Sequence, residues 1–321
     1  MQFIHVILRK TIRFIFIILA VSFITFLMVN VLPGDVAHVI SGLDGTLEDI
    51  EAIRKDLGLD RNIIARYLVW LRNAVCGNLG VSYQTGESVL DAILSRLPVT
   101  MELLIISQCI ALLFALPAGI VCAYKSNALP DRFISGIGFA SFSIPSFVMA
   151  LLSIYLFSIQ LRWLPATGYT PFFDGPWANI KSFVLPGLSI ALIEWVVLMR
   201  VLRSDMITTL QQNYILMARA KGLAPWQVLL QHALRPSSLT LFTVLGIQMG
   251  RCIGDAVIVE TIFALPGIGR LLLNAIYARD FLMVQGCIFV ITIGYVTINS
   301  LVDILYILLD PRIRTGEVNG E

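Results

Sequence analysis

The residues best suited to binding another protein lie in a basic, polar segment, residues 214–236, between two long apolar stretches. Small side chains at Ala218 and Ala220 permit close approach of a partner surface, and Gly222 permits a left-handed turn without steric cost. The order of helix, glycine and helix predicts a stiff segment that can seat in a groove. The candidate docking residues are Ala218, Arg219, Ala220, Lys221, Gly222, Leu223 and His232.

Charged and apolar side chains of this segment offer different contacts. Arg219 and Lys221 can pair with acidic groups of a partner, and Leu223 can bury apolar surface. Val228 and Leu229 are expected to add to the same apolar contact. The alternative is a solvated pair of interfacial helices that only links two spans.

Three ionisable residues lie inside apolar stretches, where an unpaired charge is costly. Glu194 lies in one stretch, and Arg251 and Asp255 lie one helical turn apart in another. That cost favours a structural ion pair between Arg251 and one of the carboxylates, which would fix the helix register. The other interpretation is that the three side chains face a pathway and leave one net negative charge that suits a cationic cargo.

A small-residue face follows the stretch that holds Arg251. Gly246, Gly250 and Gly254 recur every four residues, a spacing that suits close helix packing. This face can serve packing within the chain or contact with a second subunit.

Proline is expected to break one of the apolar stretches at Pro145, because proline has no N–H for the helix. Three serines lie near this break and can contact a cargo or bond back to their own helix. These serines are Ser141, Ser143 and Ser146.

Motifs for catalysis are missing from the sequence. It contains neither H-E-x-x-H nor the phosphate-binding loop G-x-x-x-x-G-K-[ST], so we expect no catalytic residue, metal site, cofactor or ATP hydrolysis in this chain. His232 is one of three histidines, which are distant from one another, and it is expected to pack and hydrogen-bond. The five cysteines are expected to pack as small apolar residues rather than to form a disulfide framework.

Composition places these residues in a membrane protein. Hydrophobic residues make up 57% of the 321 residues and charged residues only 14%. A helix needs about 20 residues to cross a hydrocarbon core of about 30 Å, and the sequence predicts six spans in an all-α polytopic fold. The predicted spans are residues 12–32, 99–123, 133–159, 183–201, 237–259 and 284–309.

Lys and Arg residues set the expected orientation. They are concentrated in the loops on the side of the N-terminus, so both termini are expected in the cytoplasm. The first apolar run is longer than the core of a signal peptide and no small-x-small cleavage site follows it, so it is expected to be retained. The net charge of +2 reflects this loop asymmetry and indicates no nucleic-acid partner.

The loop of residues 33–98 is expected to lie outside the membrane and to contain helices of its own. Thr46 and Asp49 resemble a capping box that opens one helix, and Asp60 can cap a second. The loop is either a packed surface element or a docking surface for an external partner. The residues expected to share one face of the second helix are Ile64, Tyr67, Leu68 and Leu71.

Short motifs run in order along nearly the whole chain. Residues 218–223, Ala-Arg-Ala-Lys-Gly-Leu, and 232–235, His-Ala-Leu-Arg, resemble the EAA loop of ATP-binding cassette importer permeases, in particular those for dipeptides, oligopeptides and nickel. The sequence departs from the family at Asn78, where Asp is usual, and at Pro236, which is expected in the first turn of the fifth span. The other matching motifs begin at Leu32, Leu57, Gly77, Leu97, Ile144, Leu164, Glu260, Asp303 and Asp310.

The resemblance implies a type I ABC importer permease fold and a division of labour. A second homologous permease completes the translocation path, and an external substrate-binding protein delivers the cargo. One or two cytoplasmic ATP-binding subunits hold ATP and magnesium, and residues 213–236 couple this chain to them. The chain is then a multi-pass subunit of the bacterial inner, or cytoplasmic, membrane that contacts lipid and is not an enzyme by itself.

The same resemblance implies the organisation of the chain and its cargo. Di- or oligopeptides, moved by alternating access, are the expected cargo, and nickel or a metal chelate is the alternative. A self-contained secondary transporter is less expected, because no internal repeat is seen. The implied regions are an N-terminal transmembrane helix (1–32), an external helical loop region (33–98), a five-helix permease core (99–309) with the coupling segment 213–236, and a cytoplasmic tail (310–321).

Overall fold

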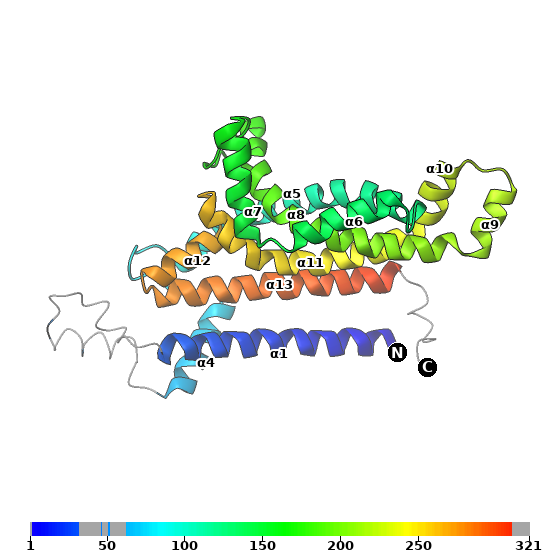
Figure 1. Cartoon of the computed structure of the whole chain (residues 1–321). Helices are drawn as coiled ribbons and strands as arrows, with labels where there is room; N and C mark the ends of the chain where they lie inside the picture. The colour runs from blue at the N-terminus through cyan, green and yellow to red at the C-terminus, as the bar shows by residue number, and fades with distance from the viewer. Residues whose placement is uncertain (1, 32–45, 47–50, 52–61, 310–321) are drawn as a thin grey trace. The chain divides into compact units, whose positions relative to one another are not determined.

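The computed structural model describes residues 2–31, 46, 51 and 62–309, and these residues are mainly helical (Figure 1). No strand forms within them, and their β-type pairing is one isolated bridge between Val81 and Ser88. The expected all-α fold is therefore confirmed. The predicted capping box at 46–49, the cap at Asp60 and the motifs that begin at Leu32, Leu57 and Asp310 rest on residues outside the described part.

The chain packs as two units, each with its own apolar core. Unit 1 comprises Met1–Thr100 and Pro266–Val296, and unit 2 comprises Met101–Leu265 and Thr297–Glu321. The division into an N-terminal helix, an external loop region, a permease core and a tail stays a prediction.

Unit 1 collects helices from both ends of the chain. Its helices are α1 (Gln2–Val31), α4 (Ile63–Val75), α12 (Ile268–Tyr277) and the first parts of α5 (Val89–Tyr124) and α13 (Phe281–Leu309).

The predicted face of helix α4 is buried only in part. Tyr67 is buried and Leu71 packs against the core of unit 1, as does Trp70, whereas Ile64 and Leu68 are each more than half exposed. The Tyr67 hydroxyl lies 2.8 Å from the hydroxyl of Ser22 on α1 in a hydrogen bond. The large aromatic side chains bury more apolar area than the aliphatic ones and Tyr67 also finds a polar partner, so they turn inward.

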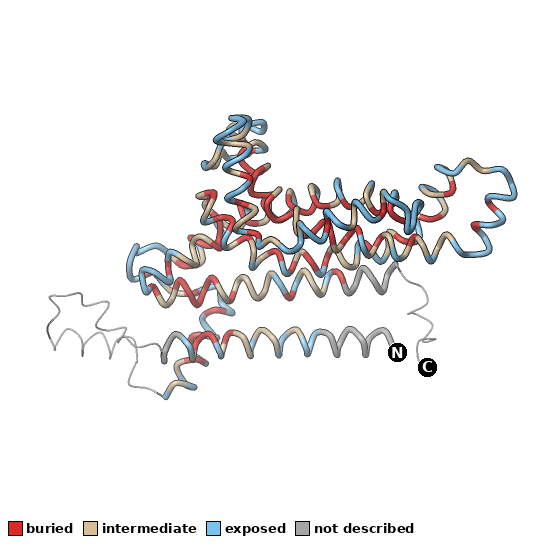
Figure 2. Tube along the Cα trace, in the orientation of Figure 1, coloured by how far each residue is buried: buried red, intermediate tan, exposed pale blue. Residues whose placement is uncertain are grey.

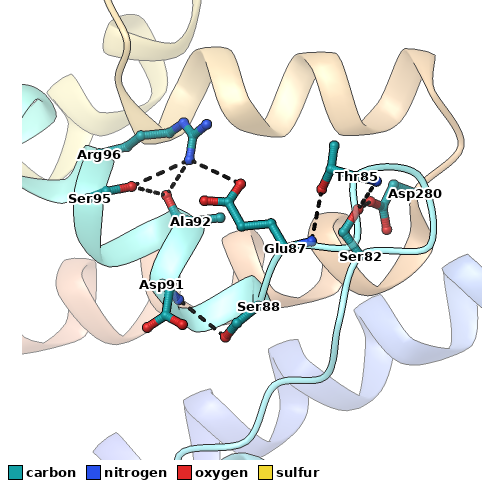
Figure 3. A network of polar contacts seen from close by, with 9 residues as sticks. All are labelled: Ser82, Thr85, Glu87, Ser88, Asp91, Ala92, Ser95, Arg96 and Asp280. Atoms are coloured by element: carbon teal, nitrogen blue, oxygen red, sulfur yellow. Dashed lines mark hydrogen bonds and ion pairs between the residues drawn. The ribbon is translucent and has the colours of Figure 1, made fainter.

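The loop before α5 is held against the start of α13 by a polar network (Figure 3). The buried Ser82 hydroxyl donates to the carboxylate of Asp280. Asp280 also accepts a hydrogen bond from the backbone N–H of Met283 at 3.2 Å and so caps α13. One carboxylate therefore fixes both the loop and the helix end.

Arg96 and Tyr83 add further polar groups at this loop. Arg96 on α5 lies 4.0 Å from the Glu87 carboxylate and donates to the Ala92 carbonyl oxygen at 2.7 Å. Burial, and then the nearby Asp280 carboxylate, raise the pKa of Tyr83 above its ordinary value, so the phenol stays protonated at neutral pH.

Unit 2 holds most of the apolar helices. In chain order after α5 these are α6 (Leu129–Phe142), α7 (Ser146–Ser153), η1 (Ile154–Gln160) and α8 (Pro176–Leu210). They are followed by α9 (Asn213–Ala220), α10 (Pro225–Gln227), η2 (Val228–Ala233) and α11 (Leu234–Ile262). Helix α8 lies at the centre and packs against α6, α7 and α11.

Small residues let the central helices approach closely. A Cβ at Gly119 on α5 would lie 2.9 Å from a methyl carbon of Leu202 on α8. A Cβ at Gly138 on α6 would lie 3.2 Å from a methyl carbon of Val196, which is also on α8. The buried core of unit 2 is therefore packed around α8, with Leu198 and Leu202 fully buried.

The helices agree with the predicted spans except at the third. Within the described part of the chain, five helices are long and apolar enough to cross a membrane, and a sixth span results if α6 and α7–η1 count as one. These two pieces meet at an angle of 100° (Figure 1). The break that was expected at Pro145 is therefore confirmed, but the third predicted span is not one continuous helix.

Candidate functional site

The coupling segment, residues 213–236, forms the expected order of helix, glycine and helix. Helix α9 ends at Ala220, and Gly222 follows with a φ of 79°, in the left-handed region. The N–H of Leu223 donates to the carbonyl oxygen of Ala218 at 3.4 Å and closes the turn. In Figure 1 this segment extends past the ends of α8 and α11.

A continuous helix leads out of the turn. The stretch Pro225–Ile262 runs through α10, η2 and α11 over 38 residues, about 57 Å at 1.5 Å per residue. Pro236 lies in the first turn of α11, as predicted, but α11 continues from the π-helical turn η2 without a break. Residues 225–262 therefore form an unbroken helical connection from the coupling segment to the far end of α11.

Exposure separates the side chains of the coupling segment that can meet a partner from those that cannot (Figure 2). Arg219, Ala220 and Lys221 are exposed and Leu223 is half-buried. Ala218 is 6% exposed and packs inside the chain together with Ile215.

The predicted apolar contact is wrong in part. Val228 is only 2% exposed, and Leu229 packs into the core of unit 2. The exposed aliphatic and tryptophan side chains are instead those of Leu216, Met217, Trp226 and Leu230. The helical period could have predicted which side chains are exposed. Ile215 and Ala218, three residues apart, share the inner face of α9, and this leaves Leu216 and Met217 on the outer face.

His232 holds parts of the coupling segment together. Its ring Nδ1 lies 3.4 Å from the carbonyl oxygen of Gln227, and its own carbonyl oxygen accepts a hydrogen bond from the Tyr214 hydroxyl at 3.4 Å. The expected packing and hydrogen-bonding role is consistent with both contacts.

The ionisable residues within the spans do not form the expected ion pair. Glu194 is buried and accepts a hydrogen bond from the side-chain amide of Gln248. Asp255 is half-buried and accepts a hydrogen bond from the Ser146 hydroxyl at 2.9 Å. Arg251 is exposed and, among the described residues, pairs with neither carboxylate. The structural ion pair is wrong because each carboxylate has a neutral partner instead.

Arg251 belongs to an exposed stripe along α11. The exposed positions of this stripe recur every three or four residues and so lie on one face of the helix. A guanidinium in the apolar part of a span is costly against lipid, so protein or water must cover this face. The stripe consists of Ile247, Arg251, Gly254, Ile258 and Thr261.

The serines near the Pro145 break have separate partners. Ser143 bonds back to the Phe139 carbonyl oxygen of its own helix at 2.8 Å, one of the two predicted outcomes. Ser141 donates to the Leu192 carbonyl oxygen of α8, and Ser146 reaches Asp255.

The small-residue face of α11 is buried at two of its glycines and exposed at the third. A Cβ at Gly246 would lie 2.0 Å from a methyl carbon of Val302 on α13, so this glycine packs within the chain. Gly250 is buried as well. Gly254 is exposed, and a Cβ there would meet no atom within 4 Å.

Family models match nearly the whole chain. The model described as "Binding-protein-dependent transport system inner membrane component" matches residues 115–315. The model described as "Binding-prot-dependent transport system membrane comp, N-term" matches residues 3–104.

Individual relatives extend this similarity. A protein of Brucella abortus (strain 2308) named as a peptide transport system permease is 40% identical over 308 residues, 96% of this chain and 98% of that protein. The glutathione transport system permease protein GsiC of Escherichia coli O6:H1 is 35% identical over 294 residues, 92% of this chain and 94% of that protein. A crystal structure of an amino acid ABC transporter with histidines aligns with a TM-score of 0.51 at 16% identity, over 67% of this chain and 93% of that chain, and this likeness shows the fold alone.

Proposed function

The chain belongs to the family of binding-protein-dependent transport system inner membrane components, and from this premise we propose that it forms half of a translocation path for di- or oligopeptides. Membership makes it a multi-pass permease subunit of an ATP-driven importer that has no catalytic activity of its own. ATP-binding and substrate-binding partners belong to such a system. We infer that the other half of the path comes from a second, homologous permease, and that one or two cytoplasmic subunits bind ATP and magnesium.

Peptide cargo is supported by the names of the relatives. The Brucella abortus relative at 40% identity is named for peptide transport, and GsiC is named for glutathione, which is itself a short peptide. The nickel or metal-chelate alternative is not favoured by these names.

The proposal that this segment couples the chain to the ATPase rests on one observation, the left-handed turn at Gly222. This turn holds Arg219, Ala220 and Lys221 exposed at the end of the continuous helix Pro225–Ile262. A nucleotide-driven movement of a partner seated on these residues would tilt α11 as a lever. With this segment on the cytoplasmic side, both termini are cytoplasmic too.

Arg251 of the exposed stripe of α11, together with the half-buried Asp255 beside the stripe, supplies the proposed contact with cargo. Arg251 and Asp255 lie four residues apart, about 6 Å along the helix, and carry opposite charges. A short peptide also carries opposite charges at its two ends. Asp255 suits the amino terminus of such a peptide, and Arg251 suits its carboxylate.

Uptake by cells that carry the whole importer tests the cargo. We expect a labelled dipeptide to enter in an ATP-dependent manner and to be competed by unlabelled dipeptide, while radioactive nickel is not taken up above the level of cells without the permease. Nickel uptake without dipeptide uptake would overturn the cargo assignment and leave the family unchanged.

A further inference from the structure

A basic cavity lies between α6 and α8 in unit 2. Its volume is about 380 Å³, and it lies toward the end of α8 that leads into the coupling segment. From Ser204 to the end of α8 the rise is about 9 Å. The polar residues that line it are Asp131, Arg132, Ser135, Arg200, Arg203 and Ser204.

One of the three arginines is already neutralised. Arg203 donates two hydrogen bonds to the Asp131 carboxylate, from Nε at 2.8 Å and from Nη2 at 2.6 Å. Asp131 also accepts from the Asn127 N–H at 2.8 Å, and its residue is 3% exposed. This bidentate ion pair lines one side of the cavity and links α6 to α8.

The other two arginines keep their charge available. Arg132 and Arg200 are exposed, and no acidic side chain of the described residues pairs with either. The Arg200 guanidinium stacks over the Phe139 ring at 5.0 Å, which holds it beside the cavity. The lining therefore carries two uncompensated positive charges, with the hydroxyls of Ser135 and Ser204 as further donors.

We propose that this cavity binds the phosphate of an anionic phospholipid headgroup. Guanidinium groups match phosphate geometry, and basic pockets between helices at a membrane surface suit such headgroups. Lipid is favoured over free phosphate because exposed apolar side chains continue from the cavity along the same face of α6: Phe139, which lines the cavity, is 53% exposed, and Phe142, three residues further on, is 54% exposed. These side chains offer a surface for the acyl chains.

Native mass spectrometry of the assembled importer tests the proposal. The complex is titrated with phosphatidylglycerol, with phosphatidylcholine and with inorganic phosphate. We expect tight binding of phosphatidylglycerol only. In the double variant Arg132→Gln and Arg200→Gln that binding weakens about 30-fold, at about 1 kcal/mol for each arginine.

Lys125→Gln is the matched control. Lys125 is exposed in the same interhelical turn region, before α6, but does not line the cavity, so its loss should leave lipid binding unchanged. If the Gln variant does not assemble, Arg132→Lys with Arg200→Lys keeps the charge and should bind phosphatidylglycerol within a few-fold of the wild type.

Three results would overturn the site. They are equal effects of the double variant and of Lys125→Gln, equal binding of phosphatidylcholine, and binding of inorganic phosphate with no preference for the lipid. The last result would show a soluble anion site rather than a lipid site. None of these outcomes depends on the cargo of the importer.

Discussion

Asp255 and Arg251 are charged residues within an apolar span of this permease, where an unpaired charge is costly. Asp255 accepts from Ser146 and Arg251 stands exposed one turn away, without an ion-pair partner among the described residues. The sequence predicted that both would matter, but not how they pair. Pairing depends on the rotation of α11 against α7 and α8, and rotation cannot be inferred from charge and depth alone.

Replacing Asp255 by Asn tests whether its charge faces the cargo. Asn keeps an acceptor for the Ser146 hydroxyl and removes the charge, so the complex should assemble. Loss of a charge-assisted contact, about 2 kcal/mol, should lower dipeptide uptake by an order of magnitude or more. Initial rates of labelled dipeptide uptake measure this.

Ser146→Ala is the control for Asp255. It removes the same hydrogen bond but leaves the carboxylate, so uptake should stay within about twofold of the wild type if charge is what the cargo needs. Uptake by Asp255→Asn that matches the wild type would remove Asp255 from the pathway.

Gly222 requires glycine because of its backbone and not because of its surroundings. Its φ is 79°, and a Cβ there would meet no atom within 4 Å. Gly222→Val should therefore cost about 1–2 kcal/mol of backbone strain in the turn and distort the exposed residues before it. We expect an assembled complex whose dipeptide uptake is lost.

Asn tolerates the left-handed region better than other residues, so Gly222→Asn should retain most of the uptake. Comparing the two variants shows whether uptake depends on the left-handed turn or only on the absence of a side chain at this position. Normal uptake by Gly222→Val, measured in complexes that contain all subunits, would contradict the role given to this turn.

At the scale of elements, α11 and α13 interlock at one glycine. A Cβ at Gly246 would lie 2.0 Å from Val302. Gly246→Ala should therefore destabilise the permease by about 1–3 kcal/mol through overpacking, seen as a lower thermal midpoint in detergent.

Shortening the opposing side chain tests the cause. Val302→Ala in the Gly246→Ala background should recover part of the lost stability, whereas Gly254→Ala, at an open position of the same face, should cost little. The same midpoint for Gly246→Ala as for the wild type would show that α13 can move away freely.

The ends and turns of elements could be predicted from the sequence where a single residue determines the local backbone. Pro145 breaks its span and Gly222 turns the coupling segment, because each residue acts on its own backbone. The inner face of α4 was predicted only in part and the burial of Val228 was mispredicted, because both depend on which neighbour supplies the core. Aromatic packing of Tyr67 and Trp70 on one side, and the core around α8 on the other, is tertiary information.

At the scale of the whole chain, the order of motifs was more informative than any one of them. Residues 218–223 and 232–235 indicated the importer family before any helix was placed, and the family model that matches residues 115–315 covers both motifs. Composition gave the membrane class. The division into two units was not predicted, because α12 and much of α13 join a unit whose other helices come from the first hundred residues.

Cross-linking at Lys221 tests the coupling claim most directly. Cys76 and Cys109 are exposed and are first replaced by Ser, and then Lys221→Cys and Phe173→Cys are compared in the assembled importer. Phe173 is 96% exposed in the predicted external loop after the third span and serves as the control. We predict that a short reagent with a maleimide at one end and an amine-reactive succinimidyl ester at the other joins Lys221→Cys, but not Phe173→Cys, to a lysine amine of the ATP-binding subunit and stops dipeptide uptake. A Lys221→Cys thiol that stays unlinked, or that reacts with a membrane-impermeant reagent from outside intact cells, would contradict the account.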